Sequence, residues 1–184
     1  MTTNNTETAL PPVLETPITN TSQGAQDFDF FMGHWSIENK KLLQPLSGSD
    51  QWESFMATQH AQKLPAGIGN YDEFTPLDWR PGFIGMSLRI YNPETGMWSI
   101  YWLNNKNGGI EASTGMLAAP VVGQFQNGVG SFLGPDQFDG KAILVRYTWS
   151  DISPNSARWQ QAFSNDEGLS WETNWIMQMS RVQK

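Results

Sequence analysis

Four polar side chains stand inside otherwise apolar stretches, where their chemistry would matter most in a folded core. They are Arg89 in "MSLRIY", Asn104 in "IYWLN", Arg146 in "LVRYTW" and Gln160 in "ARWQQAF". A buried arginine is costly unless it meets a carboxylate or an anionic ligand. We expect Arg89 to face solvent, because serines such as Ser87 share its face, whereas both orientations stay open for Arg146. Asn104, Arg146 and Gln160 would orient a bound molecule by hydrogen bonds.

Residues typical of metal centres or nucleophilic catalysis are scarce. The chain has no cysteine, and its two histidines are His34 and His60. The zinc-binding H-E-x-x-H pattern, the G-x-S-x-G nucleophile elbow and the phosphate-binding glycine loop do not occur. The stretch "GPDQFDG", at 134–140, has too few ligands for an EF-hand loop. We therefore expect no metal and no cofactor. We expect His34 to point outward, and His60 either to meet solvent or to reach a cavity mouth.

One motif has a well-known counterpart in glycosidases. The stretch "SNDEGLSW", from Ser164 to Trp171, has the S-x-D-x-G-x-S-W spacing of an Asp-box and resembles the hairpins of sialidase propellers. A propeller needs typically four or more blades, with a repeat of ~40–50 residues. The 184-residue chain contains one copy of the motif, so a propeller is excluded. We predict a structural hairpin, in which Asp166 accepts hydrogen bonds and Gly168 adopts the left-handed conformation.

Composition and charge exclude several classes of partner. The formal net charge is −7 and the sequence pI is about 4.7. This balance disfavours binding to nucleic acid and to anionic membrane surfaces. No apolar run approaches the ~18–20 residues of a membrane span, and no signal peptide is recognisable. We therefore expect a soluble, cytoplasmic protein, and the sequence leaves open whether it forms a homo-oligomer.

The chain divides into a tail and one domain. Residues 1–26 are rich in Thr, Asn and Pro and contain no aromatic residue, which predicts a flexible tail. Residues 27–184 alternate short extended stretches with turn signals, a pattern typical of an all-β barrel or sandwich. A short helical turn is expected within 25–35, and 109–117 is one of the candidate strands.

The candidate strand at 97–104 is apolar on both faces. The domain also has nine tryptophans, and a closed barrel with a lined interior accommodates so many large rings more readily than a thin sandwich. If the turn pairs Tyr91 with Met97, then Trp98 and Trp102 share the inner face with Ile100, Leu88 and Ile90.

The two ends of the domain resemble a known superfamily. Gly33, His34 and Trp35 open the first strand as G-x-W, and Arg181 lies in the last strand. This pair resembles the signature of the calycins, the lipocalins and fatty-acid-binding proteins. The stretch 27–184 also resembles an uncharacterised group of bacterial lipocalin-like proteins. The resemblance implies a single antiparallel up-and-down barrel of 8 to 10 strands, an Arg181 guanidinium within about 6 Å of Trp35, and binding of small apolar molecules.

Taken together, these features predict a protein that binds a small hydrophobic or aromatic ligand inside a barrel cavity. The apolar wall would come from Trp98, Trp102, Trp175 and Met177. The orienting polar groups would be Asn104, Arg146 and Gln160. Two alternatives stay open: a cofactor-free cyclase or isomerase acting on a hydrophobic metabolite in the same cavity, and a structural module whose barrel is filled by its own side chains.

Overall fold

The structure is a computed structural model, and it describes residues 23–183. Most of the predicted tail, residues 1–22, lies outside the described residues. The last part of that segment, Gln23–Gln26, forms a short 3-10 helix, η1, and a second one, η2, follows at Asp29–Phe31. The predicted helical turn within 25–35 is therefore confirmed, as two short 3-10 helices.

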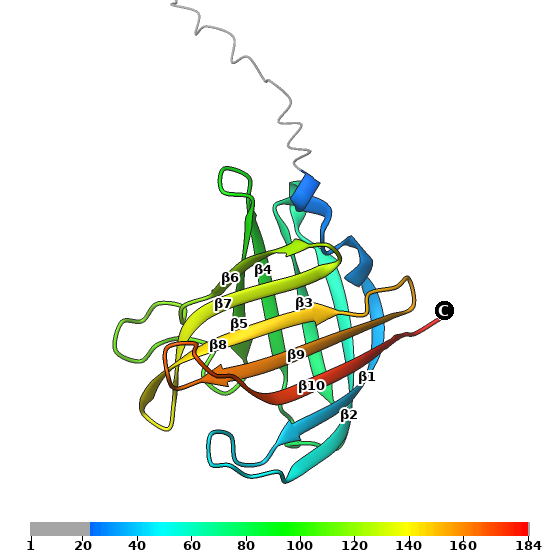
Figure 1. The fold of residues 1–184 in the computed structure, drawn as a ribbon. Helices are drawn as coiled ribbons and strands as arrows, with labels where there is room; N and C mark the ends of the chain where they lie inside the picture. The colour runs from blue at the N-terminus through cyan, green and yellow to red at the C-terminus, as the bar shows by residue number, and fades with distance from the viewer. Residues whose placement is uncertain (1–22, 184) are drawn as a thin grey trace, which may run out of the picture.

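Ten antiparallel strands close into a single barrel (Figure 1). Each strand pairs with its neighbours in sequence, and β1 pairs with β10 to close the ring. The all-β architecture predicted from the turn spacing is confirmed, and so is the single up-and-down barrel that the resemblance implied. The strands are β1 (Gly33–Leu42), β2 (Trp52–Lys63), β3 (Gly69–Pro76), β4 (Gly85–Asn92), β5 (Met97–Asn104), β6 (Val121–Gln126), β7 (Val129–Phe138), β8 (Lys141–Ser150), β9 (Ser156–Ser164) and β10 (Glu172–Arg181).

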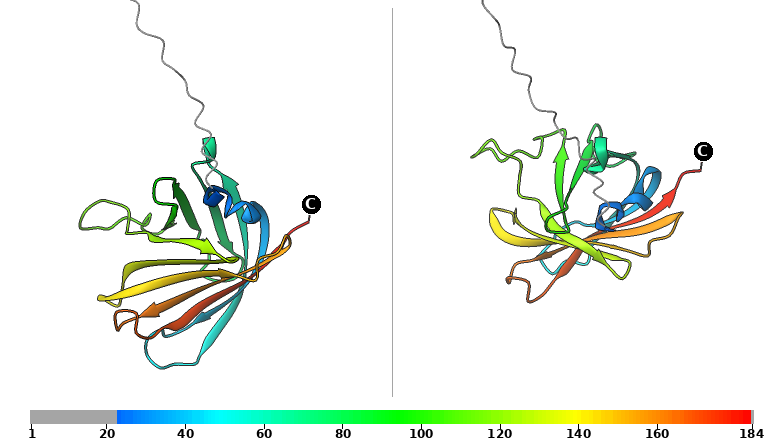
Figure 2. Two further views of the ribbon diagram at one scale, coloured as in Figure 1. Left: turned by 45° about the horizontal axis from the view of Figure 1, so that its top comes forward. Right: turned by 90° about the horizontal axis from the view of Figure 1, so that it is seen from above.

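One end of the barrel is closed by the segment before β1. The helices η1 and η2 lie at this end, together with η3 (Pro65–Gly67), as the views in Figures 1 and 2 show. Phe28 and Phe31 are fully buried there, and Phe28 meets Trp98 edge to face with 5.0 Å between ring centroids. We call this closed end the base and the opposite end the mouth. We call residues 23–32 the base segment, and its aromatic rings fill the interior at this end of the barrel.

The contact predicted between the first and last strands is confirmed. Arg181 lies with its guanidinium carbon 4.3 Å from the Trp35 ring centroid. Its Nη1 donates to the Met32 carbonyl at 2.7 Å, and its Nε donates to the Pro154 carbonyl at 2.6 Å. Its Nη2 donates to the Phe30 carbonyl. The Trp35 indole N–H donates to the Phe31 carbonyl at 2.7 Å. Arg181 thus ties the base segment to β1 and β10.

Two expectations about the strands are wrong. The segment 109–117 is no strand: it contains only the isolated bridge between Ile110 and Leu117. In addition, β4 and β5 pair Tyr91 with Trp98, one residue away from the predicted register. The turn explains the shift, because the Gly96 amide donates to the Asn92 carbonyl and closes a shorter loop. A shift of one residue reverses the faces of a strand, so Leu88 and Ile90 point away from the interior.

Candidate functional site

A cavity of about 120 Å³ lies inside the barrel, between the base and the mouth. Its walls are largely aromatic, and they come from most of the strands around the ring. The large apolar residues that line it are Phe74, Ile100, Trp102, Tyr147, Trp149, Trp159, Trp175, Met177 and Met179. The polar ones are Gln59, Ser87, Arg89, Asp136 and Gln161.

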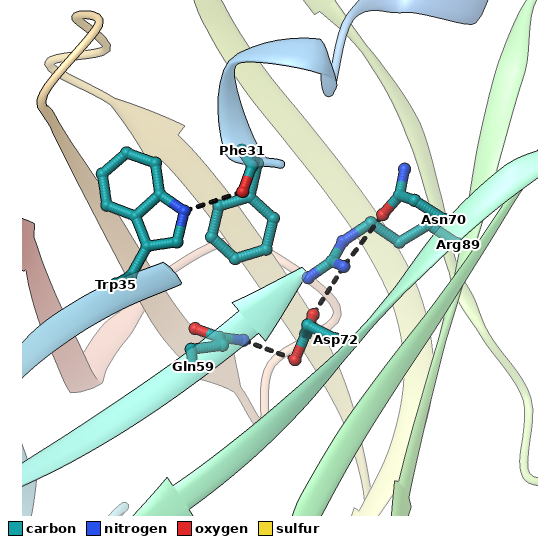
Figure 3. Close-up of polar contacts among 6 residues, drawn as sticks. All are labelled: Phe31, Trp35, Gln59, Asn70, Asp72 and Arg89. Carbon is teal, nitrogen blue, oxygen red and sulfur yellow. Dashed lines mark hydrogen bonds and ion pairs between the residues drawn. The ribbon is translucent and has the colours of Figure 1, made fainter. Parts of the chain in front are cut away.

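A buried ion pair lies beside this cavity (Figure 3). Arg89 Nη1 is 2.6 Å from Asp72 Oδ2, and the two side chains are 3% and 0% exposed. Gln59 Nε2 donates to Asp72 Oδ1 at 2.5 Å, and Arg89 Nη1 donates to Asn70 Oδ1 at 3.1 Å. The four residues come from β2, β3 and β4, which are consecutive in the barrel. The pair places a positive and a negative charge together, so the network adds no net charge to the interior.

The expectation that Arg89 faces solvent is therefore wrong. The one-residue change in register between β4 and β5 is the cause, since it turns Ser87, Arg89 and Tyr91 into the barrel. The guanidinium carbon of Arg89 lies 5.0 Å from the Phe31 ring centroid and 5.1 Å from that of Phe28. Arg89 thus joins the aromatic base to the cavity.

Several polar atoms of the cavity residues are buried without a hydrogen-bond partner among the described residues. They are Oε1 of Gln59, Nε of Arg89 and the indole Nε1 of Trp149. Each unpaired polar atom costs roughly 1–3 kcal/mol when it is removed from water. Native proteins carry few such groups, so three of them around one cavity are notable. The walls offer both donors and an acceptor to a molecule that fits among them.

The ionisation of Tyr147 is also perturbed. Burial raises the pKa of its hydroxyl well above the usual range, and the negative charge of Asp136 raises it further, while Arg89 acts in the opposite direction. The hydroxyl is therefore protonated at neutral pH and can act as a donor. This charge state suits hydrogen bonding to a ligand.

The structure brings three of the predicted site residues to the cavity. Trp102, Trp175 and Met177 all line it, and the predicted inward orientation of Trp98 and Trp102 is confirmed. Trp98 lies closer to the base. Its ring packs on Phe28, and its indole N–H donates to the Gly24 carbonyl at 3.0 Å. In this structure Trp98 anchors the base segment and does not line the cavity.

The three predicted orienting groups lie elsewhere. Asn104 caps the turn after β5, where its side-chain oxygen accepts from the Lys106 amide at 2.9 Å. Arg146 stacks its guanidinium over the Trp171 ring at 4.3 Å. Gln160 alternates with the cavity residues Trp159 and Gln161, so it points away from the interior. Strand alternation explains the last two positions, because β8 directs Tyr147 inward and β9 directs Gln161 inward.

The polar residues that do reach the cavity were missed at the sequence level. Gln161 is the inward neighbour of Gln160, and its Nε2 donates to Asn174 Oδ1 at 2.8 Å. Gln59 lies in a strand that resembles an ordinary amphipathic one. A signal was present in β2, where the apolar Phe55, Ala57 and Ala61 alternate in step with Gln59. That period-2 pattern places Gln59 inside.

The two histidines lie on the outside of the barrel, away from the cavity. His34 and His60 are paired across β1 and β2, with their rings stacked at 3.9 Å. The expected outward orientation of His34 is confirmed. His60 shares that outer face and lies near the base, so it does not reach the mouth. Among the described residues, no cluster of three or more His, Cys, Asp or Glu side chains is arranged to hold a metal ion.

The hairpin between β9 and β10 uses Asp166 as an acceptor. Its Oδ1 accepts from the Ser170 amide at 2.9 Å and from the Ser164 hydroxyl at 2.7 Å, and its Oδ2 accepts from the Ser170 hydroxyl at 2.5 Å. These bonds lower the pKa of Asp166 to about 2. Gly168 has φ of 90°, as a left-handed turn position requires. Neither residue lines the cavity.

Comparison with solved structures finds the same barrel in other proteins. The S-type phycobiliprotein lyase CPES from Guillardia theta matches with a TM-score of 0.56 and 12% identity, over 94% of this chain and 99% of that one. A protein of unknown function from the DUF3598 family of Nostoc punctiforme matches with a TM-score of 0.50 and 13% identity, over 84% of this chain. This chain spans 49% of that protein's length.

Sequence comparison adds nothing to this likeness. No family model and no curated protein matches the chain. At 12% and 13% identity, the two structural matches show the fold alone. That fold is a closed antiparallel barrel of ten strands, within the range of 8 to 10 that the resemblance implied. Across residues 23–183, the structure contains no helix long and apolar enough to cross a membrane.

Proposed function

We propose that this protein binds a small, largely aromatic molecule in the cavity of the barrel. The observation that carries the proposal is the composition of the walls. Large apolar side chains, among them the rings of Trp102, Trp159 and Trp175, make up most of the walls. Polar atoms of Gln59, Arg89 and Trp149 there have no partner in the described chain. Apolar walls with a few convergent polar groups are typical of small-molecule sites.

The size of the cavity limits the ligand. Its volume of about 120 Å³ is below the ~300–1,000 Å³ typical of drug-sized ligands. It is close to the ~150 Å³ cavity that admits a single benzene ring. The proposal therefore concerns a ligand whose buried part is about one aromatic ring. The phycobiliprotein lyase shares this barrel, and the likeness supports the scaffold, while the ligand class is argued from the walls of this chain.

A neutral single-ring probe tests the proposal. We expect trans-cinnamamide to bind, to quench tryptophan fluorescence and to give a saturable heat signal in isothermal titration calorimetry. Trp102→Ala should weaken binding by roughly 1–3 kcal/mol, because a ring of the wall is lost. Trp52→Ala is the matched control, since Trp52 is 39% exposed and does not line the cavity.

A second variant tests the same cavity by reducing its volume. Ser87 lines the cavity and is buried, so Ser87→Leu should fill part of the space and abolish binding. Circular dichroism checks that each variant is folded. If cinnamamide fails to bind the wild-type protein, or if Trp52→Ala weakens binding as much as Trp102→Ala, the probe does not use this cavity and the proposal is wrong.

A further inference from the structure

Two cations lie near the mouth of the barrel, and each rests on an indole ring. Lys41 Nζ, on β1, lies 3.8 Å from the Trp175 ring centroid. The guanidinium carbon of Arg80, in the loop between β3 and β4, lies 4.3 Å from the Trp79 ring centroid. The two indole centroids are 6.0 Å apart. Trp175 also lines the cavity, so its ring contacts both the cavity and the Lys41 ammonium.

Trp79 holds the loop that carries Arg80 in place. Trp79 stacks on Phe55 with centroids 4.6 Å apart and planes 6° from parallel. Its indole N–H donates to Glu53 Oε1 at 2.9 Å. Glu53 is paired with Lys41 across β1 and β2. The cations are therefore placed by packed rings and by a strand register, which limits the freedom that solvent-exposed cations usually have.

The charges around Lys41 do not balance. Burial, and then the positive charge of Arg80, lower the pKa of Lys41 to about 8. The carboxylate of Glu53 has the opposite, smaller effect and raises this pKa. The ion pairs within residues 23–183 are Lys63 with Asp29 and Arg89 with Asp72, so neither mouth cation has a carboxylate within 4.0 Å. Lys41, Arg80 and Glu53 together leave one positive charge, although the whole chain has a formal net charge of −7.

We propose, on the basis of the proposed function, that the ligand is an aromatic monocarboxylic acid, whose ring enters the cavity and whose carboxylate lies at the mouth between Lys41 and Arg80. A single negative charge neutralises the excess of one positive charge. A dianion such as a phosphate monoester would leave an uncompensated negative charge beside Glu53. A guanidinium and an ammonium are both strong donors to a carboxylate, and such charge-assisted bonds are about twice as strong as neutral ones. The anion also relieves the repulsion between the two cations.

The carboxylate has a separate test from the cavity. Trans-cinnamate and trans-cinnamamide have nearly the same shape and differ in charge, so the ratio of their dissociation constants isolates the contribution of the mouth. We expect cinnamate to bind the wild-type protein at least about tenfold more tightly, a preference that higher salt reduces. Lys41→Gln and Arg80→Gln should each remove most of this preference and leave the affinity for cinnamamide nearly unchanged.

Lys40→Gln is the matched control, because Lys40 is the exposed neighbour of Lys41 on the other face of β1. It removes the same charge from the protein and should keep the preference. Equal affinity for cinnamate and cinnamamide, or an equal loss of preference in Lys40→Gln, overturns the inference while leaving the cavity proposal intact. Failure of both probes overturns the proposed function instead. Phenyl phosphate should bind more weakly than cinnamate, and tighter binding contradicts the single-charge argument.

Discussion

Arg89 shows what one polar residue does in an otherwise aromatic interior. Its charge is matched by Asp72 at 2.6 Å, and its guanidinium lies among Phe28, Phe31 and Trp149. A buried ion pair contributes little net stability compared with an apolar pair of the same size. Its role here is positional, because it connects β3 and β4 to the base segment beneath the cavity.

Breaking this pair from one side should be severely destabilising. Arg89→Met leaves the Asp72 carboxylate buried without its cation, which typically costs ~3–5 kcal/mol. We expect the urea midpoint to fall accordingly. The double variant Arg89→Met with Asp72→Leu should recover most of that loss, because no unpaired charge is then buried. If the double variant is as unstable as the single one, the cost comes from packing and not from the orphaned charge.

The sequence could not identify this pair, and the reason is a single turn. The apolar and polar residues of β4 alternate, so the local pattern predicts the apolar Leu88 and Ile90 inside and Arg89 outside, and only the strand register shows otherwise. The length of the turn at 93–96 decides which face it is, and pairing Asn92 with Met97 puts Arg89 inside. For β5 the inward face was predicted correctly, because Trp98 and Trp102 are large and apolar.

At the scale of elements, the hairpin between β9 and β10 is held by one carboxylate. Asp166 accepts bonds from Ser164 and Ser170, and these bonds lower its pKa to about 2. Because the folded pKa is below the unfolded value near 3.9, the ionised form favours the folded state above about pH 4. This contribution is lost as the pH falls from about 4 towards 2.

We therefore expect Asp166→Ala to lower the melting temperature at pH 7 and to weaken its dependence on pH between about 4 and 2. Binding of cinnamamide should be unchanged, since Asp166 does not line the cavity. Glu94→Ala is the control, because Glu94 is an exposed acid in another hairpin turn and its side chain makes no hydrogen bond within the described chain. A normal melting temperature with abolished binding would reverse the assignment of Asp166 as a structural residue.

The elements that could be predicted from sequence are those with strong local signals. G-x-W at Gly33 and Arg181 near the end identified the closure of the barrel, and the contact between Trp35 and Arg181 is present. The inward groups that were missed, Gln59 and Gln161, depend on how their strands pair with their neighbours. That information comes from pairing across the barrel, and a local pattern does not contain it.

At the scale of the whole molecule, the barrel has two ends with different chemistry. The base is sealed by Phe28, Phe31 and the Arg181 contacts. The mouth is bordered by the two cations and by Glu53. The cavity between them has aromatic walls, so a molecule with an apolar ring and one charged end matches this polarity in one orientation only. Titration of Lys41 then becomes a means of testing that orientation.

The affinity for trans-cinnamate should fall as the pH rises through about 8, because the Lys41 ammonium loses its proton there. Below that pH both mouth cations are charged, and Arg80 remains charged throughout, so part of the affinity persists at pH 10. A bound carboxylate raises the pKa of Lys41, and the complex therefore takes up protons at pH 8, which calorimetry in buffers of different ionisation enthalpy measures directly. Cinnamamide should show no such dependence, and Lys41→Gln should remove it for cinnamate. A pH profile that Lys41→Gln leaves unchanged would assign the titration to another group and place the carboxylate elsewhere.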